Sequence, residues 1–475
     1  MVFSSHIFLF YFLPIFFIIY YALPFQWKGL YPKNTWITIA SYIFYGWLVP
    51  WFVVLMLAST TWDYVCGKII TKPGQVQWKR KAALMTAIVG DMGLLIFFKY
   101  YMFTMENVNH LLQLFGLGAN YFHVMSILLP SGISFYTFVA LSYTIDLYRG
   151  EAQPARNFPT FSCFIGLFPH LIAGPIIRYS TVAEQLANRT HTVEKFATGL
   201  GIFMLGFAKK ILLANSAGAV ADAVFSANNP GMLNAWWGIL AYHFQIYFDF
   251  CGYSDMAVGL AKMLGIEFPK NFNAPYLSTS IQMFWKRWHM TLSAFIMDYL
   301  YIGALGGNRK GTARTYFNLC LTFFLCGLWH GAKYTFVVWG LYQGLFLVFE
   351  RLIGKKTVYY WMPVWAQVIV TNILVLFGWV VFRAPDLHQG LVYWGSMIGI
   401  VKPVASAALL SSQIFTPRHI FEMALCAFLV WQPIQAHDWA KKLSIPKMAV
   451  CAALFLLAIC GMFTQTFNPF LYFQF

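Results

Sequence analysis

The sequence predicts an all-helical protein that crosses a membrane many times, and three observations lead to this fold class. Of its 475 residues, 60% are hydrophobic and only 10% are charged, whereas soluble globular domains carry about 25% charged residues. The mean hydropathy is +0.62. The apolar segments run without interruption over about 15–25 residues, which suits membrane helices and not the alternating strands of a barrel. We therefore expect about 10–12 transmembrane helices, together with several shorter or re-entrant ones.

The expected helices follow apolar segments that are separated by short polar or basic stretches. In chain order these segments are 5–23, 35–49, 51–68, 83–103, 121–147, 158–177, 195–226, 232–264, 281–304, 314–331, 333–352, 362–383, 386–401, 418–434 and 447–466. Those at 35–49, 158–177 and 386–401 are short or interrupted by glycine or proline, as expected of re-entrant or tilted pieces. We expect one membrane-embedded domain over residues 1–475, with a motif-bearing core at about 120–352 and C-terminal helices at 362–466.

Basic residues between the apolar segments predict the orientation. The N-terminal segment lacks a basic stretch and a small-residue cleavage site, so we expect it to be a retained first helix and not a secretory signal. The strongest cytoplasmic signal is KPGQVQWKRK, Lys72–Lys81, and counting back through three helices places the N-terminus outside. The same rule explains the net charge of +16. Attraction of anionic lipid or of an acidic carrier is a second role for these positive charges.

A hairpin is expected to carry a histidine deep into the membrane. The basic stretches GGNRKGTAR (Gly306–Arg314) and ERLIGKK (Glu350–Lys356) are both expected to face the cytoplasm. The far turn of the two helices between them then holds Trp329, His330 and Gly331. A helix from Arg314 to His330 is about 24 Å long at ~1.5 Å per residue, which places His330 far across a hydrocarbon core of about 30 Å.

His330 is the first candidate for chemistry. Ionisable groups inside membrane segments are energetically expensive and mark functional sites. A neutral imidazole in an apolar pocket can accept a proton as a general base or attack as a nucleophile. Gly331 would let the backbone approach a substrate closely. A structural or interfacial role is the alternative for a histidine at a helix end. Trp329 beside it, and a second histidine earlier in the chain, favour the catalytic role.

The second histidine, His289, lies in the tryptophan-rich stretch FWKRWHMTLS. We expect it to be a second catalytic or substrate-orienting residue. Lys286 and Arg287 suit the binding of a phosphate or carboxylate, and snorkelling to the membrane interface is their structural alternative. Trp285 and Trp288 are typical of an interfacial aromatic belt.

Acidic residues are expected to shape a polar passage. The stretch YFDFCGYSDMAVG carries Asp249, Ser254 and Asp255. Two carboxylates six positions apart do not share a helix face, which disfavours a paired acid and base. We expect them instead to pair with basic residues of other helices. The candidate partners are Arg178, Lys262, Lys286 and Arg287. Arg178 and Arg287 are also expected to line the passage, whereas Lys209 and Lys210 are expected to snorkel to the cytoplasmic interface.

Other kinds of site lack their sequence patterns. The eight cysteines are scattered, mostly in apolar segments, and show no CxxC spacing, so we interpret them as small buried hydrophobic residues. No nucleotide-binding glycine loop, HExxH or GxSxG pattern occurs. Nucleotide hydrolysis, zinc proteolysis and serine hydrolysis are therefore disfavoured, and no metal site is expected.

Five stretches together resemble the membrane-bound O-acyltransferase family. They are MVFSSHIFLFYFLPIFFIIYY, FPHLIAGPIIRY, FDFCGYSDMAVG, FWKRWHMTLSAFIMDYLYIGALGGNRKG and LWHGAKYTFVVWGLYQG, which run in order from residue 1 to about 345. The combination of RWH, LGGNRKG and WHGA is most similar to the bacterial branch that serves alginate O-acetylation. The resemblance implies a ring-like bundle of tilted helices around a tunnel, with His330 as the catalytic histidine and His289 as its partner.

The resemblance also implies a reaction and its partners. An acetyl group would come from a cytoplasmic thioester, acetyl-CoA in this branch, and would cross the bacterial inner membrane through the protein, with no bound cofactor. A periplasmic acetyltransferase would then place it on polysaccharide hydroxyls. Contacts with membrane lipid are expected, and contacts with nucleic acid are not. Peptidoglycan or cellulose O-acetylation and teichoic-acid D-alanylation from a carrier protein are alternatives. Lys333 departs from the pattern of the branch and is expected to alter the pocket or the donor contacts.

Two rival functions use the same residues differently. A transporter of a lipid-linked sugar or anion would use the intramembrane charges, but it predicts inverted repeats with broken helices, and the sequence shows none. A scaffold that only recruits the periplasmic enzyme predicts that His289 and His330 are both replaceable.

Overall fold

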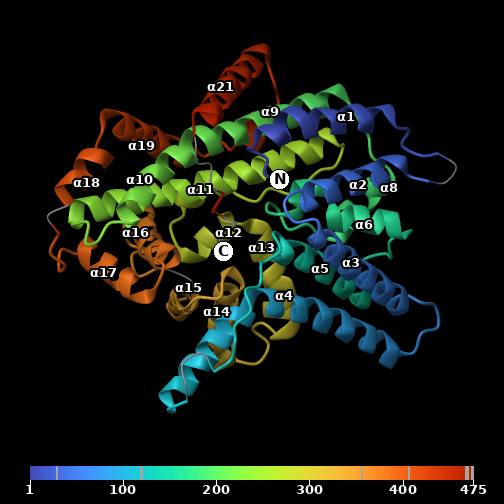
Figure 1. The fold of residues 1–475 in the computed structure, drawn as a ribbon, viewed down its shortest axis with the longest axis horizontal. Helices are drawn as coiled ribbons and strands as arrows, with labels where there is room; N and C mark the ends of the chain where they lie inside the picture. Colours follow the sequence, from blue (N-terminus) through green and yellow to red (C-terminus); the bar gives the residue numbers. More distant parts are fainter. Residues whose placement is uncertain (28–29, 118–120, 355–356, 405–406, 466–469, 472–475) are drawn as a thin grey trace. The chain divides into compact units, whose positions relative to one another are not determined.

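Helices joined by loops make up the part of the chain that the computed structural model describes (Figure 1), namely residues 1–27, 30–117, 121–354, 357–404, 407–465 and 470–471. Within these ranges the one β contact is an isolated bridge between Trp27 and Leu30. The expected all-helical class is confirmed. Internal contacts divide the chain into two compact units. The N-terminal unit comprises Met1–Gly199 and Leu260–Phe268, and the C-terminal unit comprises Leu200–Gly259 and Pro269–Phe475. The single domain and the ring around a tunnel stay predictions.

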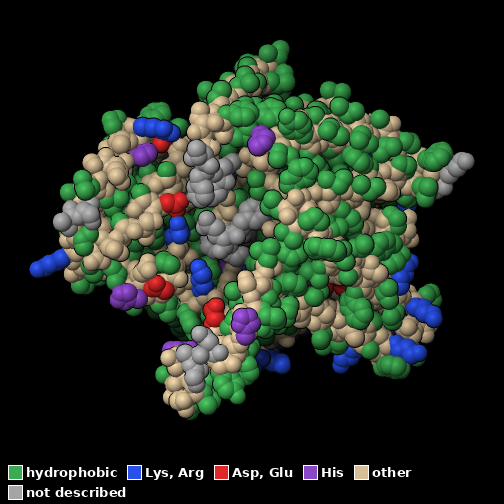
Figure 2. Space-filling view, in the orientation of Figure 1, with side chains coloured by type: hydrophobic (Ala, Val, Ile, Leu, Met, Phe, Trp, Pro, Cys, Tyr) green, Lys and Arg blue, Asp and Glu red, His purple; other side chains and the backbone are tan. Residues whose placement is uncertain are grey.

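Five stretches of helix in the described residues are long and apolar enough to cross a membrane. They are α3 (Trp51–Ile70), α4 (Gln77–Leu114), the stretch Val193–Phe225, α16 (Val364–Arg383) and α21 (Ile445–Thr464). Large apolar side chains are exposed, and Figure 2 shows hydrophobic side chains gathered over the upper and right-hand parts of the visible face. Apolar surface of this extent suits a membrane and not water. The chain is a multi-pass membrane protein, and the count of about 10–12 spans stays a prediction.

The N-terminal unit is built from short and long helices. Besides α3 and α4, it contains η1 (Phe8–Phe12), α1 (Leu13–Ala22), α2 (Pro32–Gly46), α5 (Ile133–Arg149), α6 (Phe158–Gly166), α7 (Phe168–Leu171) and α8 (Tyr179–Ala187), and α9 (Val193–Ala208) begins in it. The segment at 158–177 breaks into two short helices, as expected of an interrupted piece. The segment at 121–147 was expected to be helical throughout, but its helix begins only at Ile133. Pro130 and Gly132, whose φ is +76°, disfavour helix before that point.

The C-terminal unit contains the motif-bearing helices. In order these are η2 (Lys209–Ala214), α10 (Asn215–Phe225), α11 (Met232–Met263, whose last residues belong to the N-terminal unit), η3 (Pro275–Leu277), α12 (Ile281–Arg287), α13 (Met290–Phe295), η4 (Ile296–Ala304), α14 (Thr312–His330), α15 (Tyr334–Leu352), α16, α17 (Leu387–Met397), α18 (Ala407–Ile414), α19 (Pro417–Val430), α20 (Ala436–Trp439) and α21. The expected segment at 281–304 is not one helix, because the chain breaks at residues 288–289 between α12 and α13.

Helices α14 and α15 form the expected hairpin and lie side by side (Figure 1). Glycines let their backbones touch. A Cβ atom on Gly327 would overlap the carbonyl oxygen of Phe336, and one on Gly340 would overlap that of Phe323. Small residues allow such close approach between membrane helices, where van der Waals packing drives association. The hairpin therefore holds His330 at its turn by backbone contact.

Replacing Gly327 by alanine is expected to destabilise the protein by about 1–3 kcal/mol, because the new methyl group must push the two helices apart. Thermal unfolding of the detergent-solubilised protein measures the change. Gly93→Ala in α4 is the matched control, since a Cβ there meets nothing within 4 Å, and it should stabilise by about 0.4–1 kcal/mol. Equal shifts in both variants would contradict the proposed contact.

The cysteine prediction is confirmed. All eight cysteines are free, and six are buried, whereas Cys320 is half-buried and Cys460 is exposed. Most of them are small side chains of the helix packing, whereas Cys251 Sγ also lies 3.5 Å from Lys209 Nζ and 3.7 Å from Asp255 Oδ2.

Candidate active site

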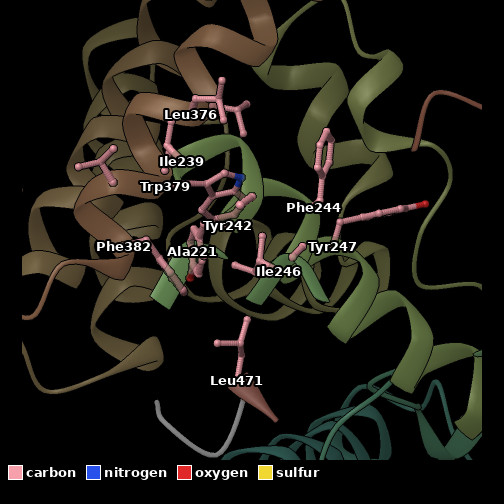
Figure 3. Close-up of a cluster of buried hydrophobic side chains, with 14 of the residues drawn as sticks. Ala221, Ile239, Tyr242, Phe244, Ile246, Tyr247, Leu376, Trp379, Phe382 and Leu471 are labelled. Atoms are coloured by element: carbon pink, nitrogen blue, oxygen red, sulfur yellow. The ribbon is translucent and has the colours of Figure 1, made fainter. Parts of the chain in front are cut away.

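The two candidate histidines meet in one cavity of the C-terminal unit. His289, His330 and Asp249 line it. Its other lining residues are Ile246, Phe250, Trp285, Trp288, Leu292, Trp339, Trp379, Phe382 and Leu471. Figure 3 shows part of this wall, with Trp379 and Phe382 from α16 and Ile246 from α11. An apolar cavity with a few convergent polar groups is typical of a ligand-binding or active site.

His330 is the last residue of α14, at the far turn of the hairpin, as expected. Its ring lies edge-on to Trp339, with centroids 5.1 Å apart and planes at 89°, and similarly to Phe382, at 5.1 Å and 79°. Edge-to-face contacts of this kind restrain a ring without using its nitrogens. His330 is 9% exposed, so the imidazole is held in an apolar wall near the limit of full burial.

The neighbours of His330 do not line the cavity. Trp329 is buried and contacts the His330 ring at 4.8 Å between centroids. A Cβ atom on Gly331 would overlap the ring of Phe336, so glycine is needed at this position for packing, and its predicted approach to a substrate stays a prediction. Lys333, the residue that departs from the family pattern, precedes α15 with an exposed side chain. Lys333 is absent from the cavity wall, and its expected effect on the pocket or on the donor contacts stays a prediction.

His289 sits at the break between α12 and α13 in a left-handed conformation, with φ +43° and ψ +54°. This conformation costs roughly 1–2 kcal/mol for a residue with a side chain, and strain of this kind gathers at functional sites. A preceding loop holds the break in place. The Met290 N–H donates to the carbonyl of Asn271 at 2.9 Å, and the Asn273 N–H donates to that of Arg287 at 3.0 Å.

Asn271 determines which nitrogen of His289 carries the proton. The Thr291 N–H, which can only donate, lies 3.3 Å from Asn271 Oδ1, and the Thr291 hydroxyl donates to the same oxygen at 2.9 Å. The amide oxygen therefore faces His289, whose Nδ1 is 3.1 Å away. Because that oxygen can only accept, Nδ1 must be the protonated nitrogen, and in the neutral ring Nε2 is the basic one. Asn271 Nδ2 in turn donates to Ser254 Oγ at 3.1 Å.

Ser254 thus contacts the residue that hydrogen-bonds to His289. It is absent from the cavity wall and reaches His289 through Asn271, and its role in lining the passage stays a prediction. Asn271 was not among the residues expected to form the site. Its signal is a polar side chain in the loop before the RWH stretch, and only the folded loop shows what it touches.

Replacing Asn271 by aspartate is expected to move the acidic limb of the pH–rate profile to higher pH, because a carboxylate beside His289 stabilises the imidazolium. Asn271→Leu, which removes the hydrogen bond, should lower the rate of acyl transfer about tenfold, equivalent to ~1.4 kcal/mol. The pH dependence of acyl release measures both. The exposed neighbour Asn273→Asp serves as the matched control, and a shift as large in that variant would refute the assignment.

Two consecutive lysines pair with the two acidic residues. Lys210 Nζ lies 2.6 Å from Asp249 Oδ1, and Lys209 Nζ lies 2.7 Å from Asp255 Oδ2. The Lys210–Asp249 side chains are 3% and 2% exposed. The prediction that both lysines snorkel to the interface is therefore wrong, and the four expected partners of the acidic residues are replaced by these two. Asp249 Oδ2 also accepts the Leu471 N–H at 2.8 Å. One oxygen of the carboxylate in the cavity therefore pairs with Lys210, and the other accepts a backbone hydrogen bond.

Glycines and a wide helical turn bring these ion pairs together. A Cβ atom on Gly206 would lie 2.6 Å from the carbonyl oxygen of Gly252, and one on Gly252 would lie 2.7 Å from that of Gly206. The two helices therefore touch along their backbones. The lysines begin the π-helix η2, in which each turn holds an extra residue. Neighbouring lysines can thus both turn toward α11 and meet carboxylates six positions apart.

The remaining predicted passage residues lie outside the cavity wall. Arg287 donates from Nη1 to the carbonyl of Ala274 at 3.4 Å, and Asp255 is engaged with Lys209. Arg178 belongs to the N-terminal unit. The passage roles of all three stay predictions.

The tryptophans of the RWH stretch are not an interfacial belt. Trp285 and Trp288 are 8% and 5% exposed and line the cavity, whereas Lys286 is exposed. Trp285 Nε1 donates to Gln343 Oε1 at 3.2 Å, which ties α12 to α15.

A buried carboxylate anchors the helix that leads to His289. Glu350 of α15 accepts the N–H groups of Ile281 and Gln282 at 2.7 and 3.0 Å, at the start of α12. Ser280 caps the same end by accepting the Met283 N–H at 2.9 Å. Negative charge at a helix N-terminus is stabilising. Glu350 lies in a stretch whose basic residues predict a cytoplasmic position, and nothing in that stretch predicts this contact.

Two imidazoles line one aromatic cavity of a multi-pass helical protein, an arrangement that suits acid–base chemistry. The chain belongs to the membrane-bound O-acyltransferase family, whose model matches residues 148–388. It is 41% identical to the probable alginate O-acetylase AlgI of Pseudomonas putida over the whole of both chains. It is 34% identical to the peptidoglycan O-acetyltransferase of Helicobacter pylori, covering 84% of this chain and 80% of that one. It is 29% identical to the teichoic acid D-alanyltransferase of Bacillus subtilis, covering 54% of this chain and 69% of that one. The expected family is confirmed, and the protein is an acyltransferase.

Proposed function

We propose that the protein moves an acetyl group from acetyl-CoA in the cytoplasm to the outside of the bacterial inner membrane, for O-acetylation of an alginate-like polysaccharide. A periplasmic acetyltransferase partner completes the transfer. The observation that carries this proposal is the shared cavity, in which His289 and His330 face one apolar space. Membership of an acyltransferase family favours this function over transport or scaffolding, for which neither histidine is needed.

The proposed chemistry uses His330 as a general base. Its imidazole takes the proton of an acceptor hydroxyl while that oxygen attacks the thioester carbonyl carbon. The C–O bond forms, the C–S bond breaks, and the proton passes from the imidazolium to the leaving thiolate. His289 orients the hydroxyl through Nε2, the nitrogen that its hydrogen bond to Asn271 leaves basic. The aromatic wall excludes water, which would otherwise hydrolyse the thioester.

Similarity to the relatives supports alginate as the acceptor. The alginate O-acetylase is similar over its entire length, the peptidoglycan enzyme over a smaller share and at lower identity, and the teichoic acid enzyme over about half of this chain. Peptidoglycan is the second candidate acceptor, because its relative is still 34% identical over most of both chains.

Release of acetyl from a radiolabelled donor tests the reaction. Membranes that contain the protein are incubated with acetyl-CoA or with a D-alanyl carrier protein, and membranes with His330→Ala are the control. We expect release from acetyl-CoA that depends on His330. Equal release in both membranes would refute the proposal, and release from the carrier alone would favour D-alanylation.

The acceptor is tested in cells. Alginate and peptidoglycan are purified from cells with and without the gene, and ester-linked acetyl is measured by mass spectrometry. We expect the loss to be confined to the exopolysaccharide. Loss from peptidoglycan alone would favour the second candidate. Alginate polymerisation genes beside this gene would support the first.

A further inference from the structure

A cluster of basic side chains surrounds Tyr20 in the N-terminal unit, separate from the residues of the cavity. Lys33 comes from the start of α2, and Arg189 and His191 come from the loop between α8 and α9. Lys33 Nζ lies 4.7 Å from the centre of the Tyr20 ring, and the Arg189 guanidinium carbon lies 5.6 Å from it. His191 Nε2 lies 2.8 Å from the Tyr20 hydroxyl. We call these three residues, Lys33, Arg189 and His191, the basic cluster.

The Arg189 side chain is held in place with unused donors. Its Nη2 donates to Asn34 Oδ1 at 2.8 Å, and Asn34 Nδ2 donates to the carbonyl of Leu186 at 2.8 Å. The guanidinium also lies 5.3 Å from the centre of the Phe25 ring. Arg189 is 8% exposed, and its Nε and Nη1 are buried with no acceptor in the described part of the chain. Buried donors without partners are rare, because each has lost its hydrogen bonds to water without gaining others.

His191 adds a further group to the cluster. The Tyr20 hydroxyl donates to the carbonyl of Leu264 at 2.9 Å. Since a hydroxyl has one proton, its oxygen must accept from His191, so Nε2 of His191 carries a proton. Burial, together with the nearby charges of Lys33 and Arg189, lowers the pKa of His191 to about 4. His191 is therefore neutral at pH 7, and a bound anion would favour its protonation.

The charge of the basic cluster is not balanced. Across the described ranges, neither Lys33 nor Arg189 forms an ion pair with a carboxylate, and the two charges repel each other. Lys33 is 7% exposed and Arg189 8%. A buried charge without a counter-charge loses hydration, and the faces of the Tyr20 and Phe25 rings make up only part of that loss. An anion would satisfy both the charge and the unused donors.

The surroundings of the basic cluster indicate a membrane interface. Next to it in the chain, Trp27, Leu30 and Val193 are 58%, 63% and 87% exposed. Exposed tryptophan and aliphatic side chains beside basic residues are typical of the level of lipid headgroups. In the predicted orientation this end of α1 faces the cytoplasm, where the leaflet carries anionic lipids.

We propose that Lys33, Arg189 and His191 bind a phosphate group at the membrane interface, from the headgroup of an anionic phospholipid or from a soluble phosphate. Arginine suits this ligand because its planar fork matches phosphate oxygens and Nη2 is already fixed by Asn34. The site lies in the N-terminal unit, and the proposal does not depend on the acyl-transfer reaction.

The full-length protein in nanodiscs tests the proposal. Thermal unfolding is compared in phosphatidylcholine alone and in phosphatidylcholine with phosphatidylglycerol, and native mass spectrometry counts the phosphatidylglycerol that stays bound. We expect a higher Tm with phosphatidylglycerol, and about tenfold weaker lipid binding in Arg189→Gln and in Lys33→Gln, equivalent to ~1.4 kcal/mol. Arg189→Lys, which keeps the charge, should lie between these variants and the unchanged protein. Lys72→Gln removes an exposed charge of the same unit and should behave like the unchanged protein.

A second arm identifies the source of the phosphate. Inorganic phosphate or pyrophosphate is titrated in phosphatidylcholine nanodiscs. A rise in Tm that Arg189→Gln abolishes assigns the site to a soluble phosphate, and a response to phosphatidylglycerol alone assigns it to a lipid. The proposal is overturned if no anion raises the Tm, or if Lys72→Gln weakens binding as much as Lys33→Gln. If Arg189→Gln fails to fold, the amount of phosphatidylglycerol bound to Lys33→Gln still tests the proposal.

Discussion

Replacing His330 by alanine is expected to lower acyl transfer by about 10²–10⁴-fold, because the reaction loses its general base. The fold should persist, because His330 is the last residue of α14 and the glycine contacts that hold the hairpin together lie elsewhere in the two helices. Release of radiolabelled acetyl from membranes measures the rate, and thermal unfolding of the purified protein measures the fold.

The controls separate loss of the base from loss of structure. His388, an exposed histidine of the same unit, should be replaceable by alanine without effect. His289→Ala should also lower the rate, and the double variant should be little worse than His330→Ala, because residues that act as a unit are not additive. Normal O-acetylation by a folded His330→Ala protein would refute the proposed role.

Replacing Lys210 by methionine is expected to destabilise the protein by about 3–5 kcal/mol, because Asp249 would remain as a buried charge without its counter-charge. The two side chains are 3% and 2% exposed, so water cannot replace the lost partner. Unfolding of the solubilised protein by heat or denaturant measures the change. Lys441→Met, which breaks the exposed pair with Asp438 at 3.6 Å, should change stability by about 0–1 kcal/mol.

A double variant distinguishes the charge from the packing. Lys210→Met with Asp249→Leu replaces the whole pair by apolar side chains, and it should recover most of the stability that Lys210→Met loses. If the double variant is as unstable as the single one, the loss comes from packing and not from the unpaired charge. A stable double variant that no longer transfers acetyl would show that the Asp249 carboxylate in the cavity also serves the reaction.

The sequence predicted which two histidines belong to the candidate site better than it predicted the residues that contact them. His330 at the turn of a hairpin follows from apolar segments and basic ends, which are local features. The break at His289 does not, because its left-handed conformation depends on Asn271 and Asn273 in a loop that contacts the break only after folding. For the same reason the prediction of an interfacial belt at Trp285 and Trp288 is wrong, because both side chains line the cavity.

The sequence by itself determined that this protein is helical, lies in a membrane, and carries two histidines in a family motif. Hydropathy and short motifs are properties of residues that are neighbours in the chain, so they can be recognised from the sequence without knowledge of the fold. Only the tertiary structure showed that Lys209 and Lys210 point into the protein and pair with carboxylates. It also showed that Asn271 determines which nitrogen of His289 carries the proton, and that Glu350 binds the N-terminus of α12. Each of these contacts joins residues that are distant in the chain. The glycines that allow two helix backbones to touch can be recognised as packing residues only once the helices are packed together.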